Sequence, residues 1–262
     1  MFFSAEWQVP TFEEKRLRPK QNAYCLCVFV INEGERIIRQ LAKMKSLASV
    51  VDIIIADGGS ADGSLAEARL QASGVTALLT KTGPGRLSAQ MRMALAWAMV
   101  NDYSGVVVVD GNDKDDTAAV PQFVELLKQG YDHVQGSRFI AGGREENTPW
   151  SRLWGVKLIH APLLSLAAHY GYTDTTNGFR AYSRRLLLDP RVQPFRDIFS
   201  DYELHYYLAI RGAQLGRVTE TPVTRAYPPG EKAPSKISGW RGNWNILKTL
   251  GNAMFHKWDP RS

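Results

Sequence analysis

The feature that most constrains the fold of this chain is a regular alternation of short apolar runs with segments in which apolar residues recur at helical spacing. The apolar runs predict buried strands at 23–31, 50–56, 75–79, 106–109 and 133–135. The helical segments lie between or after them, at 37–47, 64–72, 87–99 and 120–128. Strands that alternate with helices form a mostly parallel sheet flanked by helices, so the sequence predicts an α/β fold.

The predicted sheet and helices suit one domain with a tail at each end. A chain of 262 residues, 44% of them hydrophobic, can bury a single large core. We expect a polar N-terminal arm at 1–21, a catalytic domain at 22–232, and a basic, aromatic-rich amphipathic tail at 233–262. The N-terminus lacks a secretory signal pattern, no apolar run reaches a membrane-spanning length, and the two cysteines suit core thiols. These features predict a cytoplasmic protein.

Polar and acidic residues follow three of the predicted strands directly. They are Asn32-Glu33, Asp57–Ser60 and the acidic loop Asp110–Asp116. The carboxyl ends of parallel strands meet at one edge of the sheet, where ligands bind. The four carboxylates of the acidic loop repel one another, and a cation or a metal complex of a polyanion is the usual compensation. A solvated acidic loop, and an ordinary strand-to-helix turn at Asp57, are the alternatives.

Taken in order, these segments resemble family 2 glycosyltransferases, which have the GT-A fold, a Rossmann-like fold of nucleotide-diphospho-sugar transferases. The matching residues are Asn32-Glu33, Asp57-Gly58-Gly59-Ser60-Ala61-Asp62-Gly63-Ser64 and Asp110-Gly111-Asn112. Further segments are similar to motifs of the polyprenyl-phosphate, dolichol-phosphate mannose synthase-like branch: Gly136-Ser137-Arg138, Asp174–Arg180, Asp201-Tyr202-Glu203 and Ser235–Ser238. The resemblance covers about residues 22–240.

This resemblance implies an inverting transfer of a sugar from a UDP- or GDP-linked donor to a polyprenyl phosphate or another membrane-associated lipid or glycan. The residues implied in donor binding are Asn32, Glu33, Asp57, Gly59, Asp110, Gly111 and Asn112. Those implied in acceptor binding are Arg138, Arg180, Ser235 and Lys236. Asp110 and Arg138 are expected to be catalytic, and Asp201 or Glu203 is the candidate base if the acceptor is a hydroxyl.

Two basic segments allow a functional and a plain interpretation. Arg86 ends a Gly-rich turn before a helix, where it can meet a donor phosphate, and a plain loop with a solvated arginine is the alternative. Arg180, Arg184 and Arg185 are expected on one helix face, toward an anionic acceptor or simply toward solvent.

A divalent metal, Mg²⁺ or Mn²⁺, is implied at Asp110, Asn112 and Asp113, but the sequence departs from the family pattern here. Asn112 replaces the second aspartate of the motif, and Lys114 stands where another ligand often lies. Hard divalent cations prefer carboxylate oxygens, which predicts weaker metal binding than in the family. Either Asp113 and Asp115 supply ligands in a shifted register, or the Lys114 ammonium neutralises the diphosphate itself.

The C-terminal tail and the segment 150–168 combine tryptophans and basic residues with apolar stretches. Such segments suit a membrane surface, and packing on the catalytic domain or on a second subunit is the alternative. Together with the net charge of +6, they allow a peripheral location on the inner face of a membrane.

Two other functions stay open at this stage. A nucleotidyltransferase of similar fold usually has a Gly-rich phosphate loop after its first strand, where this chain has Asn32-Glu33-Gly34-Glu35. A non-catalytic nucleotide-binding module is suggested by the altered motif at Asp110. No recognised nucleic-acid-binding module is found, so we expect no nucleic-acid partner.

Overall fold

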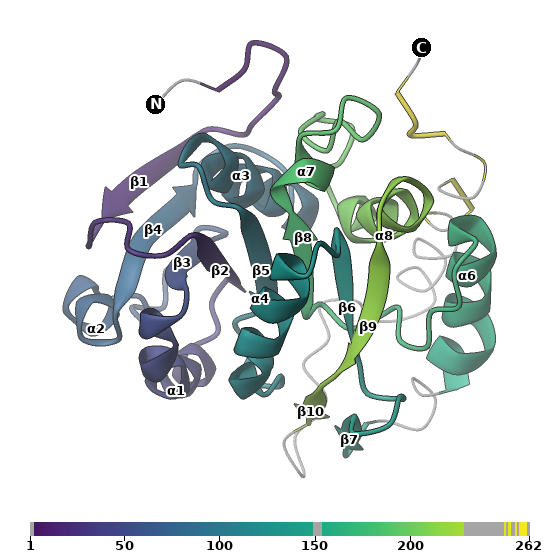
Figure 1. Cartoon of the computed structure of the whole chain (residues 1–262). Helices are drawn as coiled ribbons and strands as arrows, with labels where there is room; N and C mark the ends of the chain where they lie inside the picture. Colours follow the sequence, from purple (N-terminus) through teal and green to yellow (C-terminus); the bar gives the residue numbers. More distant parts are fainter. Residues whose placement is uncertain are drawn as a thin grey trace.

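The structure is a computed structural model that describes residues 3–148 and 154–227 and, nearer the C-terminus, residues 249, 251–252, 255 and 257–260. Within these residues, eight strands form a central sheet in the order β1-β4-β3-β2-β5-β8-β6-β9, and β10 pairs with β7 (Figure 1). The strands are β1 (Phe12–Arg16), β2 (Tyr24–Val30), β3 (Asp52–Asp57), β4 (Val75–Lys81), β5 (Gly105–Asp110), β6 (His133–Ser137), β7 (Arg144–Glu146), β8 (Arg180–Ser183), β9 (Val218–Pro222) and β10 (Thr224–Ala226).

The helical elements connect these strands. They are α1 (Glu35–Met44), η1 (Lys45–Ser49), α2 (Glu67–Ala72), α3 (Leu87–Val100), η2 (Thr117–Ala119), α4 (Val120–Lys128), the π-helical turn η3 (Val156–His160), α6 (Ala161–Ala168), α7 (Arg184–Leu187) and α8 (Glu203–Leu215). Every helix and strand that the hydrophobic pattern predicts between residues 23 and 135 is present, with ends shifted by a few residues.

The central sheet is mostly parallel, as the sequence predicts. Strands β4, β3, β2 and β5 pair in parallel, and β6 pairs in parallel with β9. Strand β1 is antiparallel to β4, and β8 is antiparallel to both β5 and β6. Helices α1, α2 and α4 cover one face of the sheet, while α3, α7 and α8 cover the other (Figure 1). This arrangement confirms the α/β architecture.

Two of these strands differ from the sequence expectations. The N-terminal arm at 1–21 contains β1, whose residues from Phe12 to Arg16 pair with β4 at the sheet edge. Its polar sequence suits an edge strand that is largely exposed to water. The expectation that Arg180 shares a helix face with Arg184 and Arg185 is wrong, because Arg180 begins β8 and only the other two lie in α7.

The core has one large apolar cluster on each face of the sheet. Helix α3 is buried along almost its whole length, because the sheet covers one side of it and α7 and α8 cover the other. The central strands β2, β3 and β5 are buried on both faces, which is why their sequences are nearly continuous apolar runs. Cys25 and Cys27 are buried free thiols in the cluster beneath α3, as expected for core cysteines.

The described part of the C-terminal tail contacts the domain. Trp258 packs on the clusters beside α8, with its ring centroid 6.1 Å from that of Phe199, and its carbonyl accepts a hydrogen bond from Arg196. Residues 228–248, which include most of the predicted amphipathic tail, and the first residues of the segment 150–168, up to residue 153, lie outside the described residues. In the described part of the chain, no helix combines the length and the apolar character that crossing a membrane requires.

Candidate active site

The three polar strand ends lie side by side because β2 runs between β3 and β5. Val30 at the end of β2 pairs with Asp57, and Phe29 pairs with Asp110. Two backbone bonds extend this alignment past the strand ends, from Gly58 N–H to Val30 O and from Gly111 N–H to Phe29 O, each 2.8 Å. The edge that the sequence predicts as the ligand site is therefore formed by neighbouring strands.

The turn after β3 is tied to the turn after β2 by side-chain hydrogen bonds. The Asp57 carboxylate accepts bonds from the backbone N–H of Ser60 at 2.9 Å and from its hydroxyl at 2.6 Å. The Ser60 hydroxyl oxygen accepts the Asn32 N–H, and Asn32 Oδ1 accepts the Ala61 N–H, both at 2.9 Å. Asn32 has a φ of 50°, a left-handed conformation that asparagine adopts more readily than most residues. The two motifs thus form one rigid platform.

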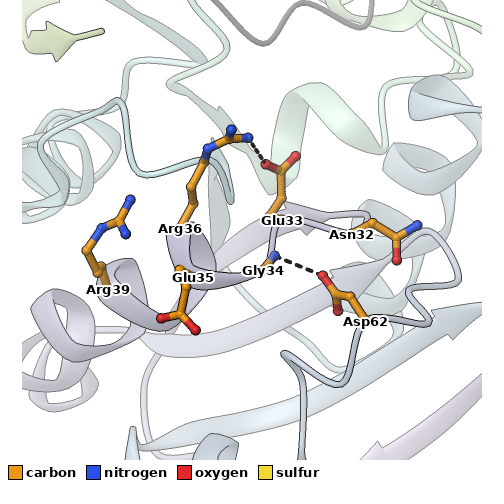
Figure 2. Close-up of a pocket in the computed structure, with 7 residues that line it drawn as sticks. All are labelled: Asn32, Glu33, Gly34, Glu35, Arg36, Arg39 and Asp62. Atoms are coloured by element: carbon orange, nitrogen blue, oxygen red, sulfur yellow. Dashed lines mark hydrogen bonds and ion pairs between the residues drawn. The ribbon is translucent and has the colours of Figure 1, made fainter. Parts of the chain in front are cut away.

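A cavity of about 430 Å³ opens beside this platform, at the start of α1 (Figure 2). Its lining residues carry both hydrogen-bond donors and carboxylates: Asn32, Glu33, Gly34, Glu35, Arg36, Arg39 and Asp62. Arg36 lies 3.3 Å from the Glu33 carboxylate, and the Gly34 N–H donates to Asp62 at 2.8 Å. Its volume lies within the range of small-molecule sites, and its lining is polar.

Asp110 ends β5 and faces a buried arginine from a distant part of the chain. Arg225, on β10, lies 3.4 Å from Asp110 and 2.5 Å from the buried carboxylate of Asp115. Burial acts to raise the pKa of Asp110, but the positive charges of Arg225 and Lys114, with a contribution from the neighbouring His205, outweigh it and hold that pKa below its ordinary value. Asp110 is therefore ionised, and its charge is balanced within the protein.

Asp113 points toward α1. Its carboxylate lies 3.2 Å from Arg39 and 2.8 Å from Lys43. Gln40 of the same helix fixes the loop, because its amide nitrogen donates to the Asp110 carbonyl at 2.9 Å and its oxygen accepts the Asp113 N–H at 2.8 Å. Asp113 and Asp110 thus face different partners.

The donor atoms around Asp110 do not fit a divalent metal well. The Oδ2 atom of Asp110 lies 3.4 Å from the Asn112 amide and 3.4 Å from the Arg225 guanidinium, and the positive charge of the guanidinium repels a cation. Asp113 and Asp115 are engaged by basic side chains. Among the described residues, no group of three or more histidine, cysteine, aspartate or glutamate side chains is arranged to hold a metal ion. The expected set of Asp110, Asn112 and Asp113 therefore stays a prediction.

Arg138 and Arg180 hold the loop 173–178 that carries Gly178 to Asp110. Arg138 forms a two-pronged ion pair with Asp174, at 2.6 and 2.9 Å, and both side chains are almost completely buried. The Arg180 guanidinium donates to the carbonyls of Asn177, Thr175 and His205. A Cβ atom added to Gly178 would lie 3.2 Å from the Asp110 carboxylate, which shows how closely this loop approaches it.

Asp201, Glu203 and Arg86 meet where the loop before α8 crosses the start of α3. The Arg86 N–H donates to the Ser200 carbonyl at 2.7 Å, and the Arg86 guanidinium lies 3.7 Å from the Asp201 carboxylate. The Glu203 carboxylate accepts the backbone N–H groups of Ser200 and Asp201, at 3.1 and 2.7 Å. Glu203 therefore shapes this loop, while Asp201 and Arg86 remain partly open to solvent.

His205, one turn into α8, is a buried neutral imidazole. Burial, with a further contribution from Arg180, lowers the pKa of His205 to about 3, although Asp110 acts in the opposite direction. An imidazole with so low a pKa is a weak base near neutral pH. The predicted acceptor residues Ser235 and Lys236 lie outside the described residues.

Residues 25–189, more than half of the chain, match the sequence profile of Glycosyl transferase family 2. The chain belongs to glycosyltransferase family 2. It is a glycosyltransferase, and this membership does not favour the nucleotidyltransferase or the non-catalytic binding module.

Two relatives that this family 2 enzyme matches have a phosphorylated polyprenol or dolichol in their names. The polyprenol monophosphomannose synthase of Mycolicibacterium smegmatis is 26% identical over 231 residues, which covers 85% of this chain and 83% of that protein. The dolichyl-phosphate hexose transferase of Haloferax volcanii is 35% identical over 155 residues, 59% of this chain and 63% of that protein.

Solved structures support the GT-A fold of this family 2 chain. Glucosyl-3-phosphoglycerate synthase from Mycobacterium tuberculosis, in complex with UDP, has a TM-score of 0.62 at 19% identity, over 91% of this chain and 81% of that one. The same protein in complex with Mn²⁺, UDP and glucosyl-3-phosphoglycerate has a TM-score of 0.60, also at 19% identity.

Two residues of the site escaped the sequence reasoning. Arg225 lies 110 residues after Asp115 in a short segment without periodicity, and only the pairing of its strand places it in the acidic loop. Gln40 falls on the apolar stripe of α1, where a buried polar residue is the available signal.

Proposed function

We propose that this family 2 glycosyltransferase transfers a sugar from a nucleoside diphosphate sugar to a polyprenyl phosphate. The observation that carries the proposal is the joined strand-end edge, which places the cavity at Asn32, the Asp57 turn and Asp110 next to one another. The names of the two lipid-phosphate relatives support the acceptor class.

The donor lies along this edge in the proposed complex. Its base, uracil or guanine, binds near Asn32 and Asp57, with the ribose toward the cavity at the start of α1. Its diphosphate lies at Asp110, where Arg225 and Lys114 supply positive charge. The Arg86 side chain is 73% exposed, beside Asp201, and can turn toward a phosphate oxygen.

In the reaction, an oxygen of the acceptor phosphate attacks the anomeric carbon as the bond from that carbon to the diphosphate oxygen breaks. The bonding electrons leave with the nucleoside diphosphate, and the configuration at the anomeric carbon inverts. An acceptor that is already anionic needs no strong base. This suits a site in which Glu203 is engaged by backbone amides and His205 has a pKa of about 3.

The polyprenyl chain would bring the enzyme to a membrane surface. Three apolar side chains on η3 and α6 face solvent, with Leu158 63%, Ile159 44% and Leu166 65% exposed. Lys157 lies among them, 4.6 Å from the ring of Phe139, and suits an anionic headgroup. We propose this surface as the membrane contact on the inner face.

The test is a transfer assay with labelled UDP- and GDP-sugars and a short-chain polyprenyl phosphate. Wild-type enzyme should form a labelled lipid product from one donor. Asp110→Asn should lose this activity with its fold intact, whereas Arg211→Gln, which alters a pair with Asp259, should retain it. Transfer only to hydroxyl acceptors, or full activity of Asp110→Asn, would contradict the proposal.

A further inference from the structure

The acidic loop at the proposed donor site contains its own balance of charge. In the described structure, three of the four carboxylates of this loop have cationic side chains near them. Arg225 lies beside Asp110 and Asp115, Arg39 and Lys43 pair with Asp113, and the charge of Lys114 acts on Asp110. The fourth, Asp116, accepts the Ala118 N–H at the start of η2. A set of acids that is already neutralised has little need of a divalent ion.

Arg225 is the central cation of this set, and the backbone fixes it there. The Asp116 N–H donates to the Thr224 carbonyl at 3.0 Å, and the Ala226 N–H donates to the Lys114 carbonyl at 2.8 Å, on either side of Arg225. Its side chain is 9% exposed and touches both Asp110 and Asp115. An arginine side chain keeps its positive charge at any ordinary pH, so the guanidinium is a permanent cation between these two carboxylates.

Lys114 adds a second cation where the family pattern often has a metal ligand. The residue is buried, and its ammonium lies 4.9 Å from the centroid of the Tyr227 ring, two residues after Arg225. Asn112 stands in place of the family's second aspartate. Its side-chain oxygen accepts a hydrogen bond from the backbone N–H of Lys114 at 3.3 Å. Both departures from the motif make the loop less negative, as a bound cation would.

We infer that Arg225, assisted by Lys114, takes the place of a divalent cation in holding the donor diphosphate, so that donor binding is independent of metal. The inference rests on the proposed function, because it concerns the same diphosphate. As the bond to the anomeric carbon breaks, the guanidinium and the ammonium stabilise the charge that develops on the leaving diphosphate. Asp110 and Asp115 orient the guanidinium.

Calorimetric binding of UDP and GDP to the full chain, in EDTA, Mg²⁺ or Mn²⁺, tests the inference directly. One diphosphate should bind with a Kd that changes less than about twofold among the three conditions. A metal that contributed about 1.4 kcal/mol to the binding free energy would change the Kd about tenfold, so the two cases are easily distinguished. Titration of Mn²⁺ followed by electron paramagnetic resonance should show no saturable site on the free enzyme. Binding that requires Mg²⁺ or Mn²⁺ would overturn the inference and leave the proposed function standing, and no binding in any condition would overturn both.

Two variants test the named residues, with Arg211→Gln as a matched control. Arg211 has a similarly buried guanidinium, 12% exposed, and pairs with Asp259 instead of the acidic loop. Arg225→Gln should weaken diphosphate binding in EDTA by about 10- to 100-fold, the usual loss for a charge-assisted hydrogen bond, while the control binds as wild type. Wild-type affinity of Arg225→Gln in EDTA would refute the role of this arginine.

Asn112→Asp keeps the shape of the side chain. It tests whether the charge of the loop makes donor binding independent of metal, even if Arg225→Gln fails to fold. It adds a carboxylate beside Asp110 without a cation of its own. Its diphosphate binding should become weak in EDTA and recover in Mn²⁺, with a Mn²⁺ resonance change that wild type lacks. Equal binding of this variant with and without Mn²⁺ would show that loop charge does not govern donor binding, and the inference would fail.

Discussion

Removing the carboxylate of Asp174 should strongly destabilise this enzyme. The Arg138 and Asp174 side chains are 2% and 0% exposed, so Asp174→Asn leaves a guanidinium buried without its counter-charge. Two charge-assisted bonds, at 2.6 and 2.9 Å, are weakened at once. Breaking a buried pair from one side costs about 3–5 kcal/mol. At roughly 2–4 °C per kcal/mol for a chain of this size, the Tm should fall by about 6–20 °C.

The assay is urea unfolding followed by circular dichroism, together with a thermal scan. The double variant Arg138→Met with Asp174→Leu should recover most of the loss, because it leaves no unpaired charge in the core. Asp102→Asn is the control, since its pair with Arg184 is exposed and asparagine tolerates the φ of 56° at this position. A loss below about 1 kcal/mol in Asp174→Asn, the range of exposed pairs, would refute the view that this ion pair holds the loop at Gly178.

Three further predictions follow from other contacts. Burial and the charge of Arg180 lower the pKa of His133 in the folded protein to about 3. As the pH falls below about 6.5, His133 therefore becomes protonated in the unfolded chain but stays neutral in the folded protein, which favours unfolding. Wild-type stability should therefore decrease between pH 6.5 and pH 5, and His133→Gln should reduce that slope by up to about 1.4 kcal/mol per pH unit in urea titrations. Gly178→Ala should weaken donor binding in calorimetry with little change in Tm, because the added methyl crowds the Asp110 carboxylate at 3.2 Å; wild-type affinity would contradict this placement. Leu158→Asp should reduce sedimentation with anionic vesicles, whereas Ile198→Asp, a change at an exposed residue outside η3 and α6, should not; equal loss in both would remove the specificity of the proposed surface.

The central strands were predictable because burial on both faces gives them an unmistakable apolar sequence. Leu26, Ile54 and Val107, for example, are completely buried in β2, β3 and β5. Strand β1 was missed because an edge strand keeps polar side chains in water. Strand β8 was missed because it begins with Arg180, a charged residue that is not expected in a buried strand. Arg180 can be buried because its guanidinium donates hydrogen bonds to three backbone carbonyls.

The candidate site divides in the same way. Asn32, Asp57 and Asp110 each follow a strong strand, so their shared edge could be predicted from the parallel sheet alone. The partners of the acidic loop come from elsewhere, Lys43 from α1 and Arg225 from β10, and nothing local marks them. Sequence reasoning therefore found the acids of this site but only part of the charge that balances them.

That balance links the altered motif to the fold. If Asn112 and Lys114 had arisen in a loop that still relied on metal, the carboxylates would be expected to face an open space with few basic neighbours. Instead, Arg225 reaches Asp110 and Asp115 from a strand whose backbone is bonded on both sides to the loop. The neutral amide of Asn112 and the buried guanidinium of Arg225 thus both lower the negative charge of this loop. Restoring the acid alone, in Asn112→Asp, should therefore create a need for metal that the natural chain does not have.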